Sequence, residues 1–311
     1  NSRREALDGK ELVEWLSSQH FCSGKVGTIG MSYHGATQLE LLSLCPKGLA
    51  ACFIGCTDFD KYDGWFRGGI PRAFGSEPDI IYGQTDNQIV KTVETIVENT
   101  VPVDEDQDRS MLREAIWQHV ENGRQIPIMR DLKWRNSYLK VSGGNHWEII
   151  SSSSYIDEIN SSGAAVYIVG GNYDIFRKET ISLWHNLTLP RKLLIGPWYH
   201  TTPKVNVSWS VEALRWFDHW LKGIDNGIER DPAVTFKVTS YDFKRRSYNS
   251  SGTGYYRTED DWPVSGGKRK LMFANEDGLS DSPAGEGVLE YSVQYIIWCA
   301  TRNVVLRLCY L

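Results

Sequence analysis

The sequence feature that most constrains the fold is a tight Gly-Met-Ser-Tyr-His-Gly turn, residues 30–35, between a short apolar run and a helical pattern. The run over 25–30 predicts a buried strand, and residues 36–44 predict a helix that ends before Pro46. A second apolar run over 49–56 predicts a neighbouring strand. Strand, sharp turn, helix and strand in this order are typical of a parallel βαβ unit.

The same pattern returns later in the chain, with strands expected over 164–169 and 192–195 and helices over 178–187 and 211–222. Between the two parts lies a stretch rich in charge and tryptophan, with helical patterns over 87–98 and 109–121. Beyond residue 228, short β-like runs such as 234–238 and 270–273 alternate with turn residues, as in a β-sandwich. We therefore predict an α/β fold with these parts: core 1–58, helical cap 59–150, core 151–228, partial β-domain 229–290, and an unassigned tail 291–311.

Ser32 stands where a catalytic serine is expected, on the turn from strand to helix. Small neighbours such as Gly30 and Gly35 let the backbone adopt strained angles and expose the serine oxygen above the sheet edge. The turn also aims backbone N–H groups and the positive end of the helix at this spot, which suits a developing oxyanion. The spacing departs from the symmetric G-x-S-x-G pattern because His34 takes the second position after the serine.

A serine nucleophile needs a base and an acid, and both residue types follow later predicted strands in the order Ser, Asp, His. Asp174 follows the run over 164–171, and His200 follows the run over 192–195. Each residue alone has an ordinary explanation, as a helix cap, a turn residue or a loop histidine. Their joint placement at strand ends predicts that His200 takes the proton of Ser32 while Asp174 orients the imidazole.

Composition and charge exclude several classes of protein. The 311 residues carry 34 basic and 39 acidic side chains, and this formal charge of −5 gives no surface for nucleic acid. No apolar stretch approaches the roughly 18–20 residues that cross a bilayer, so no membrane partner is expected. The cysteines form no CxxC pair, and neither the histidines nor the acidic run over 104–108 has metal-ligand spacing, so no metal or cofactor is predicted. These features leave compartment and oligomeric state open, although the cytoplasm is favoured.

Three strings carry a resemblance to a known family: GKVGTIGMSYHGATQ, VYIVGGNYDIF and KLLIGPWYH. They are similar to the nucleophile, acid and histidine motifs of the X-Pro dipeptidyl-peptidase and cocaine-esterase-like (CocE/NonD) hydrolases. The similarity runs from about Ala6 to Asn275 and includes residues 212–223, which resemble the family's bridge into its β-domain. Asn172 stands where the family's acid motif has an aromatic residue.

The resemblance implies an α/β-hydrolase sheet with a helical cap insertion and a C-terminal jelly-roll domain, here partial. It implies Ser32 as nucleophile, Asp174 as acid and His200 as base, and it assigns the backbone N–H of Tyr33 to the oxyanion hole. Family members also carry a preceding stretch that supplies the first strands and a tyrosine hydroxyl for the oxyanion hole. Since that stretch is missing and the tail 291–311 does not resemble a jelly roll, we expect a chain truncated at its N-terminus and aberrant at its C-terminus.

The preferred function is a serine hydrolase that cleaves an ester or amide through an acyl-enzyme. X-Pro peptides and small carboxylic esters both remain open as substrates. A dipeptidyl-peptidase needs an acidic group to hold the free amine, and acidic cap residues such as Asp60, Asp63 and Glu77 leave that option open. The alternative is an inactive fragment or remnant with a structural or binding role only.

Several further residues are candidates for the substrate pocket. His34 is a candidate because it follows Ser32 closely, and its alternative is a place on the helix surface. Trp65, Phe66 and Trp147 are candidates for an acyl or side-chain pocket under the cap. The alternative for these aromatic residues is that several of them form the cap's own core.

Overall fold

The computed structural model describes residues 3–70, 86–120, 132–200, 209–239, 241–242, 247–248, 254–264, 273–275, 278–280, 287–297 and 300–310. The chain forms two compact units, Asn1–Trp262 and Pro263–Leu311.

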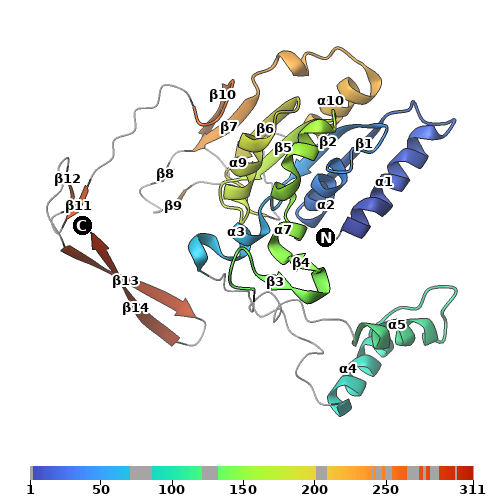
Figure 1. The fold of residues 1–311 in the computed structure, drawn as a ribbon, viewed down its shortest axis with the longest axis horizontal. Coiled ribbons are helices and arrows are strands. Elements are labelled where there is room, and N and C mark those ends of the chain that lie inside the picture. The colour runs from blue at the N-terminus through green and yellow to red at the C-terminus, as the bar shows by residue number, and fades with distance from the viewer. Residues whose placement is uncertain are drawn as a thin grey trace. The chain divides into compact units, whose positions relative to one another are not determined.

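The first unit is built around a six-stranded sheet (Figure 1). Its strands are Val26–Met31 (β1), Leu49–Gly55 (β2), Ala165–Gly171 (β5), Arg191–Gly196 (β6), Val234–Thr239 (β7) and Gly254–Glu259 (β10). They lie in the order β1-β2-β5-β6-β7-β10, and neighbouring strands are parallel except at the antiparallel β7–β10 pair. The predicted α/β fold with a mostly parallel sheet is therefore confirmed.

Helices cover both faces of this sheet. They are Arg3–Ser18 (α1), Tyr33–Leu42 (α2), Ile156–Ser161 (α8), Arg177–Asn186 (α9) and Trp209–Lys222 (α10). Side chains of β2 alternate between two cores, because successive residues of a strand point to opposite faces. Cys52 and Ile54 pack with residues of α2, α8 and α9, whereas Ala51 and Phe53 pack with residues of α10. A strand that is apolar on both faces explains the continuous apolar run seen in the sequence.

Two strands extend the sheet beyond the expected boundary near residue 228. β7 pairs in parallel with β6 over Leu193–Ile195, and the division between the two units follows Trp262. The sequence placed residues 234–238 in a separate β-domain, because a short apolar run looks the same whether it joins an existing sheet or begins a new one. The other predicted domain boundaries stay predictions.

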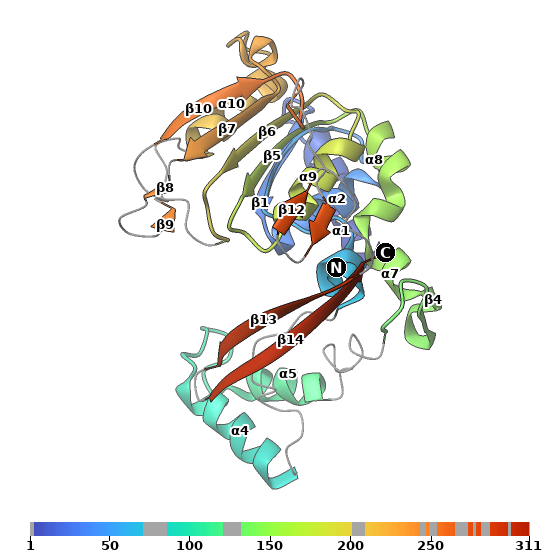
Figure 2. The ribbon, with the colours of Figure 1, turned by 90° about the vertical axis from the view of Figure 1, so that its left-hand side faces the viewer.

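The described strands of the second unit form two hairpins. They are Phe273–Asn275 (β11) with Gly278–Ser280 (β12), and Gly287–Ile297 (β13) with Ala300–Tyr310 (β14). The longer hairpin, β13–β14, is clear in Figure 2 and contains the described part of the tail 291–311. The expected partial jelly roll is not seen in the described strands, so it stays a prediction.

The region predicted as a helical cap contains mainly short elements. They are Lys61–Trp65 (α3), Arg67–Gly69 (η1), Asp86–Asn99 (α4), Ser110–Val120 (α5), Tyr138–Leu139 (β3), Lys140–Ser142 (η2), Gly144–Asn145 (β4), His146–Ile150 (α7) and Ser152–Tyr155 (η3). The helices α4 and α5 match the two predicted helical stretches closely, and Arg113 joins them by donating to both Glu94 carboxylate oxygens at 3.1 Å. Other elements in the described residues are Ile228–Arg230 (η4) and the paired strands Tyr241–Asp242 (β8) and Ser247–Tyr248 (β9).

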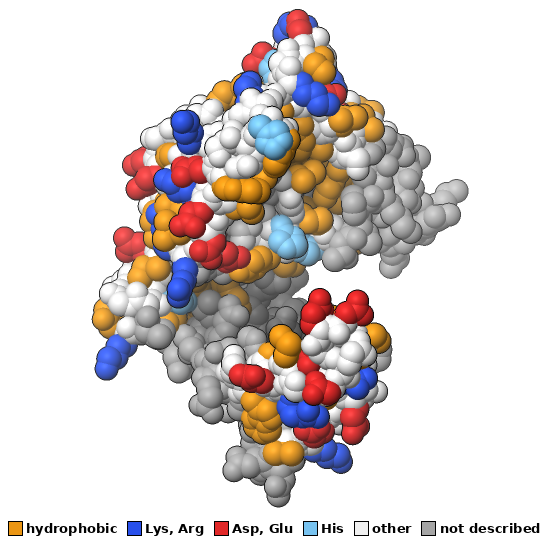
Figure 3. Space-filling model, turned by 90° about the vertical axis from the view of Figure 1, so that its right-hand side faces the viewer, with side chains coloured by type: hydrophobic (Ala, Val, Ile, Leu, Met, Phe, Trp, Pro, Cys, Tyr) orange, Lys and Arg blue, Asp and Glu red, His pale blue; other side chains and the backbone are white. Residues whose placement is uncertain are grey.

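Exposed apolar side chains gather along α1 and the outer strand β1. Leu12, Trp15 and Ile29 are each more than half exposed, at 56%, 55% and 63%. Figure 3 shows hydrophobic side chains on this face among interspersed acidic and basic ones. None of the described helices combines the length and the apolar character that crossing a bilayer requires.

Candidate active site

Ser32 lies on the turn that joins β1 to α2, with φ 58° and ψ −124°. Two flanking glycines make this turn possible. A Cβ atom on Gly30 would stand 2.6 Å from the His34 Cβ, and one on Gly35 would stand 2.8 Å from the Thr57 Cβ. Because real Cβ atoms do not approach so closely, the chain can bend this sharply only with glycine at both positions.

Two hydrogen bonds hold the serine backbone in place. The Ser32 N–H donates to the Gly55 carbonyl at 2.9 Å, and Thr57 Oγ1 donates to the Ser32 carbonyl at 2.9 Å. Both partners belong to β2 or follow it directly, so the neighbouring strand fixes the turn. The serine hydroxyl is thereby held at the carboxyl end of β1.

Asp174 and His200 lie on loops that follow β5 and β6 at the same edge of the sheet. The two loops are tied together, because the Asn172 N–H donates to the Gly196 carbonyl at 2.8 Å and the Tyr173 N–H donates to the Trp198 carbonyl at 3.1 Å. Neighbouring parallel strands end at the same edge, and this is why residues 26 positions apart meet.

The structure brings Ser32, His200 and Asp174 into one hydrogen-bonded chain. His200 Nε2 lies 2.8 Å from Ser32 Oγ, and His200 Nδ1 lies 2.8 Å from Asp174 Oδ2. The second oxygen, Asp174 Oδ1, accepts the Phe176 N–H at 2.6 Å. The Asp174 side chain is 1% exposed and that of His200 is 27% exposed. A buried carboxylate therefore orients an imidazole whose other nitrogen faces the serine hydroxyl.

Tyr33 is the first residue of α2, and its N–H is one of those that a helix start leaves without an intrahelical acceptor. Its phenol points instead toward α1, where it donates to Glu5 at 2.8 Å to Oε2 and 3.0 Å to Oε1. Burial and the neighbouring Glu5 carboxylate raise the pKa of Tyr33 to about 12. The Tyr33 side chain thus links α2 to α1, and the role of its backbone N–H in the oxyanion hole stays a prediction.

The remaining candidates for the substrate pocket stay predictions, and the structure shows what surrounds each of them. His34 is exposed and lines a hollow between α1, β1 and α2. Phe66 and Trp147 are 4% and 1% exposed and pack against each other, with ring centroids 5.7 Å apart. Trp147 Nε1 donates to the Leu132 carbonyl at 2.8 Å, and Trp65 packs at the edge of this cluster. The aromatic residues thus form a small core of the cap region.

The acidic residues proposed as amine ligands are already paired. Asp60 accepts Arg135 Nη1 at 2.6 Å, and Asp63 pairs with both Arg135 and Lys178. Glu77 lies outside the described residues. The segment that carries both aspartates is also fixed to α9, because the carboxylate of Glu179 accepts the N–H groups of residues 59 and 60 at 3.2 and 2.8 Å.

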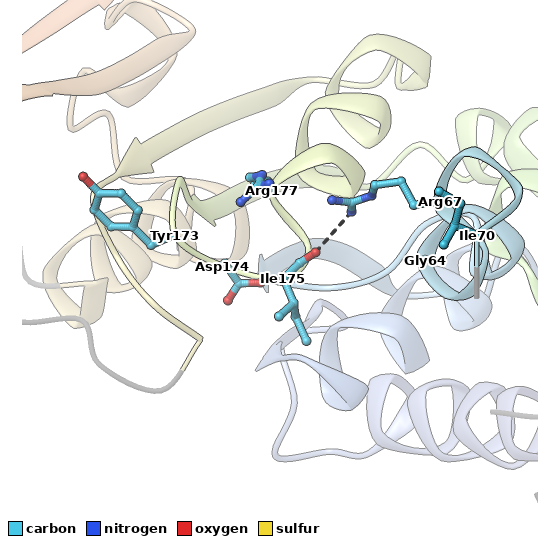
Figure 4. Close-up of a pocket in the computed structure, with 7 residues that line it drawn as sticks. All are labelled: Gly64, Arg67, Ile70, Tyr173, Asp174, Ile175 and Arg177. Atoms are coloured by element: carbon cyan, nitrogen blue, oxygen red, sulfur yellow. Dashed lines mark hydrogen bonds between the residues drawn. The ribbon is translucent and has the colours of Figure 1, made fainter. Parts of the chain in front are cut away.

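A pocket of about 430 Å³ opens beside the Asp174 loop. Figure 4 shows its lining, with Arg67 reaching from η1 toward the segment that carries Asp174. The lining residues are Gly64, Arg67, Ile70, Tyr173, Asp174, Ile175 and Arg177. Sequence reasoning missed both arginines, because an isolated arginine has no spacing signal. The only available clue was that Arg177 stands three positions after the proposed acid.

No group of His, Cys, Asp and Glu side chains in the described part of the chain is arranged to hold a metal ion. The structure does bring a serine, an imidazole and a carboxylate together at this edge of the sheet.

Comparison with known proteins identifies relatives of this chain. A family model described as X-Pro dipeptidyl-peptidase (S15 family) matches residues 1–202. A Mycobacterium bovis protein, provisionally named a serine esterase, is 29% identical over 76% of this chain and 43% of its own length. The Xaa-Pro dipeptidyl-peptidase of Lactobacillus delbrueckii subsp. lactis is 22% identical over 94% of this chain and 36% of its own length.

A solved structure shares the fold. The CocE/NonD family hydrolase from Staphylococcus aureus aligns with a TM-score of 0.67 at 18% identity, over 94% of this chain and 45% of that one. The chain thus spans less than half the length of these relatives. The resemblance drawn from the three sequence motifs is confirmed, and the chain belongs to the S15 family of X-Pro dipeptidyl-peptidases and their CocE/NonD relatives.

Proposed function

We propose that this protein is a serine hydrolase that cleaves a carboxylic ester or amide, with Ser32 as nucleophile, His200 as base and Asp174 as acid. The observation that carries the proposal is the hydrogen-bonded chain from the Asp174 carboxylate through both nitrogens of His200 to Ser32 Oγ. A serine hydroxyl is a weak nucleophile until a neighbouring base takes its proton, and this geometry supplies the base.

In the proposed reaction, Ser32 Oγ attacks the substrate carbonyl while His200 Nε2 takes the hydroxyl proton. The negative charge on the tetrahedral intermediate is stabilised by the N–H of Tyr33 at the positive end of α2. His200 then gives its proton to the leaving alcohol or amine, and an acyl-enzyme remains. Water, activated by the same imidazole, releases the acid and restores Ser32. Asp174 holds the ring in the tautomer that these steps require.

Of the two substrate types, the contacts around the site favour an ester. A dipeptidyl-peptidase must hold the free amine of its substrate with an acidic group, and the two candidates for this role within the described residues, Asp60 and Asp63, are occupied by Arg135 and Lys178. An ester hydrolase needs no such group. Ester hydrolysis is therefore the form of the activity that we propose first.

A fluorophosphonate probe tests the assignment, because it labels only a serine that a neighbouring base has activated. We expect labelling of the wild-type chain at Ser32, none in Ser32→Ala, and a labelling rate about 10⁴-fold lower in Asp174→Asn. Ser182→Ala, at a half-buried serine inside α9, is the control and should label normally. Labelling that persists in Ser32→Ala would refute the assignment. A folded chain without labelling would favour the inactive remnant.

A further inference from the structure

The pocket beside the Asp174 loop carries more positive than negative charge. Arg67 and Arg177 both line it, and both are exposed side chains. Arg67 donates through Nη2 to the Ile175 carbonyl at 3.4 Å (Figure 4). Within the described part of the chain, neither guanidinium forms an ion pair with a carboxylate. The acid in the lining, Asp174, has its two oxygens engaged by His200 and by the backbone N–H of Phe176.

Among the described residues, the cations next to the pocket, unlike its two arginines, have acidic partners. Lys178 follows Arg177 directly in the chain but turns to Asp63, which also faces Arg135. The cations of this region that have an acidic partner therefore lie outside the pocket. Two guanidinium groups remain at its wall with their hydrogen-bonding capacity largely unused. A planar guanidinium fork matches a carboxylate better than it matches any neutral group.

We propose that this pocket binds a carboxylate of the substrate, so that the enzyme hydrolyses monoesters of dicarboxylic acids. This inference rests on the proposed function of Ser32. The free carboxylate would lie between Arg67 and Arg177, and the ester carbonyl would lie at Ser32. Water is the second reactant. The bond between the acyl carbon and the alkoxy oxygen breaks, water supplies the new acyl oxygen, the alcohol leaves with one proton, and the second proton is released as the dicarboxylate forms.

The geometry also limits the length of the substrate. Asp174 belongs both to the pocket wall and to the hydrogen-bonded chain, in which the His200 ring joins it to Ser32 Oγ. The two ends of the substrate must therefore be joined by a short chain. We expect activity to pass through an optimum when the dicarboxylic acid is lengthened one methylene at a time, because a chain that is too short cannot reach both groups.

Three matched esters test the charge preference: monoethyl glutarate, the ethyl ester of glutaric monoamide, and ethyl 5-aminopentanoate. They present an anion, a neutral group and a cation at the same position. We expect kcat/KM, measured by acid release, to be highest for the anion. The ratio of anionic to neutral ester should fall about tenfold in Arg67→Gln with Arg177→Gln, since two charge-assisted contacts are lost. Arg4→Gln, an exposed arginine of α1, is the charge control and should keep the wild-type ratio.

Direct binding provides a second readout that does not depend on turnover. Glutarate titrated calorimetrically into the wild-type chain should bind, with roughly tenfold weaker binding in the double variant and weaker binding at higher salt. Glutarate that does not bind, or that binds the double variant equally well, overturns the inference. Equal hydrolysis of neutral and anionic esters overturns it as well, while leaving the proposed function intact. The proposed function itself would be refuted, by contrast, if the folded wild-type chain did not label with the fluorophosphonate probe.

Discussion

The backbone of Ser32 is predicted to store conformational strain that glycine would release. At φ 58° and ψ −124° this residue lies in a region that L-amino acids rarely adopt. Such a residue costs about 1–3 kcal/mol. Ser32→Gly and Ser32→Ala both remove the hydroxyl and its contact with His200. The difference in unfolding free energy between these two variants therefore isolates the backbone.

We expect Ser32→Gly to be more stable than Ser32→Ala by about 1 kcal/mol. Glycine recovers the strain, but it also adds conformational freedom to the unfolded chain, which costs about 0.4–1 kcal/mol. For a cooperative unit of this size, a difference of about 1 kcal/mol shifts Tm by roughly 2–4 °C. Neither variant should label with the fluorophosphonate probe, because both lack the Ser32 hydroxyl.

Urea unfolding followed by circular dichroism measures this difference, with the slope of the transition checked for each variant. Ser182, inside α9, is the matched control, because an ordinary helical residue should favour alanine over glycine by about 1 kcal/mol. The sign of the glycine–alanine difference should therefore reverse between the two serines. A preference for alanine at both positions would show that the turn at Ser32 is not strained.

Three other substitutions test neighbouring features. Gly171→Ala should lower the free energy of unfolding, measured by thermal unfolding, by about 1–3 kcal/mol, because the new Cβ would collide with the backbone carbonyl of Trp198. Stability equal to that of the wild type would show that this loop can move aside. Trp147→Ala should lower the free energy of unfolding by about 3–5 kcal/mol, because Trp147 is a buried core residue. If Trp147 only lined a substrate pocket, its loss would change KM without changing Tm. Burial raises the pKa of Glu40, so the folded carboxyl binds its proton more tightly than the unfolded one and stability falls as pH rises above 4.5. Glu40→Gln should flatten that fall in Tm above pH 4.5, and an unchanged slope would show that Glu40 is not its source.

Short sequence patterns predicted the elements of the fold that depend on residues close together in the chain. The run over 25–30, the glycine-flanked serine and the following helix predicted β1, the turn and α2, because each depends on residues close in the chain. The order Ser, Asp, His then pointed to loops at the ends of parallel strands. Those loops meet in the structure because parallel strands share one edge.

Features that depend on contacts between residues far apart in the chain could not be predicted from the sequence. The partner of β7 was assigned to a different domain, because nothing in residues 234–239 says which strand will accept its hydrogen bonds. Trp147 carries no mark that separates a core residue from a pocket residue, since both are apolar and aromatic. Arg67 and Arg177 became informative only when the fold set them beside one pocket.

The helix α9 links two parts of the site that the chain order keeps far apart. Its Glu179 accepts the backbone N–H groups of the segment that leads to Arg67, and its first turn follows directly from the Asp174 loop. Both walls of the pocket are thus attached to α9. A small shift of α9 would move Arg67, Arg177 and Asp174 together and change their alignment with Ser32. A substitution in α9 that is remote from the substrate would then change the turnover rate without altering any reacting group.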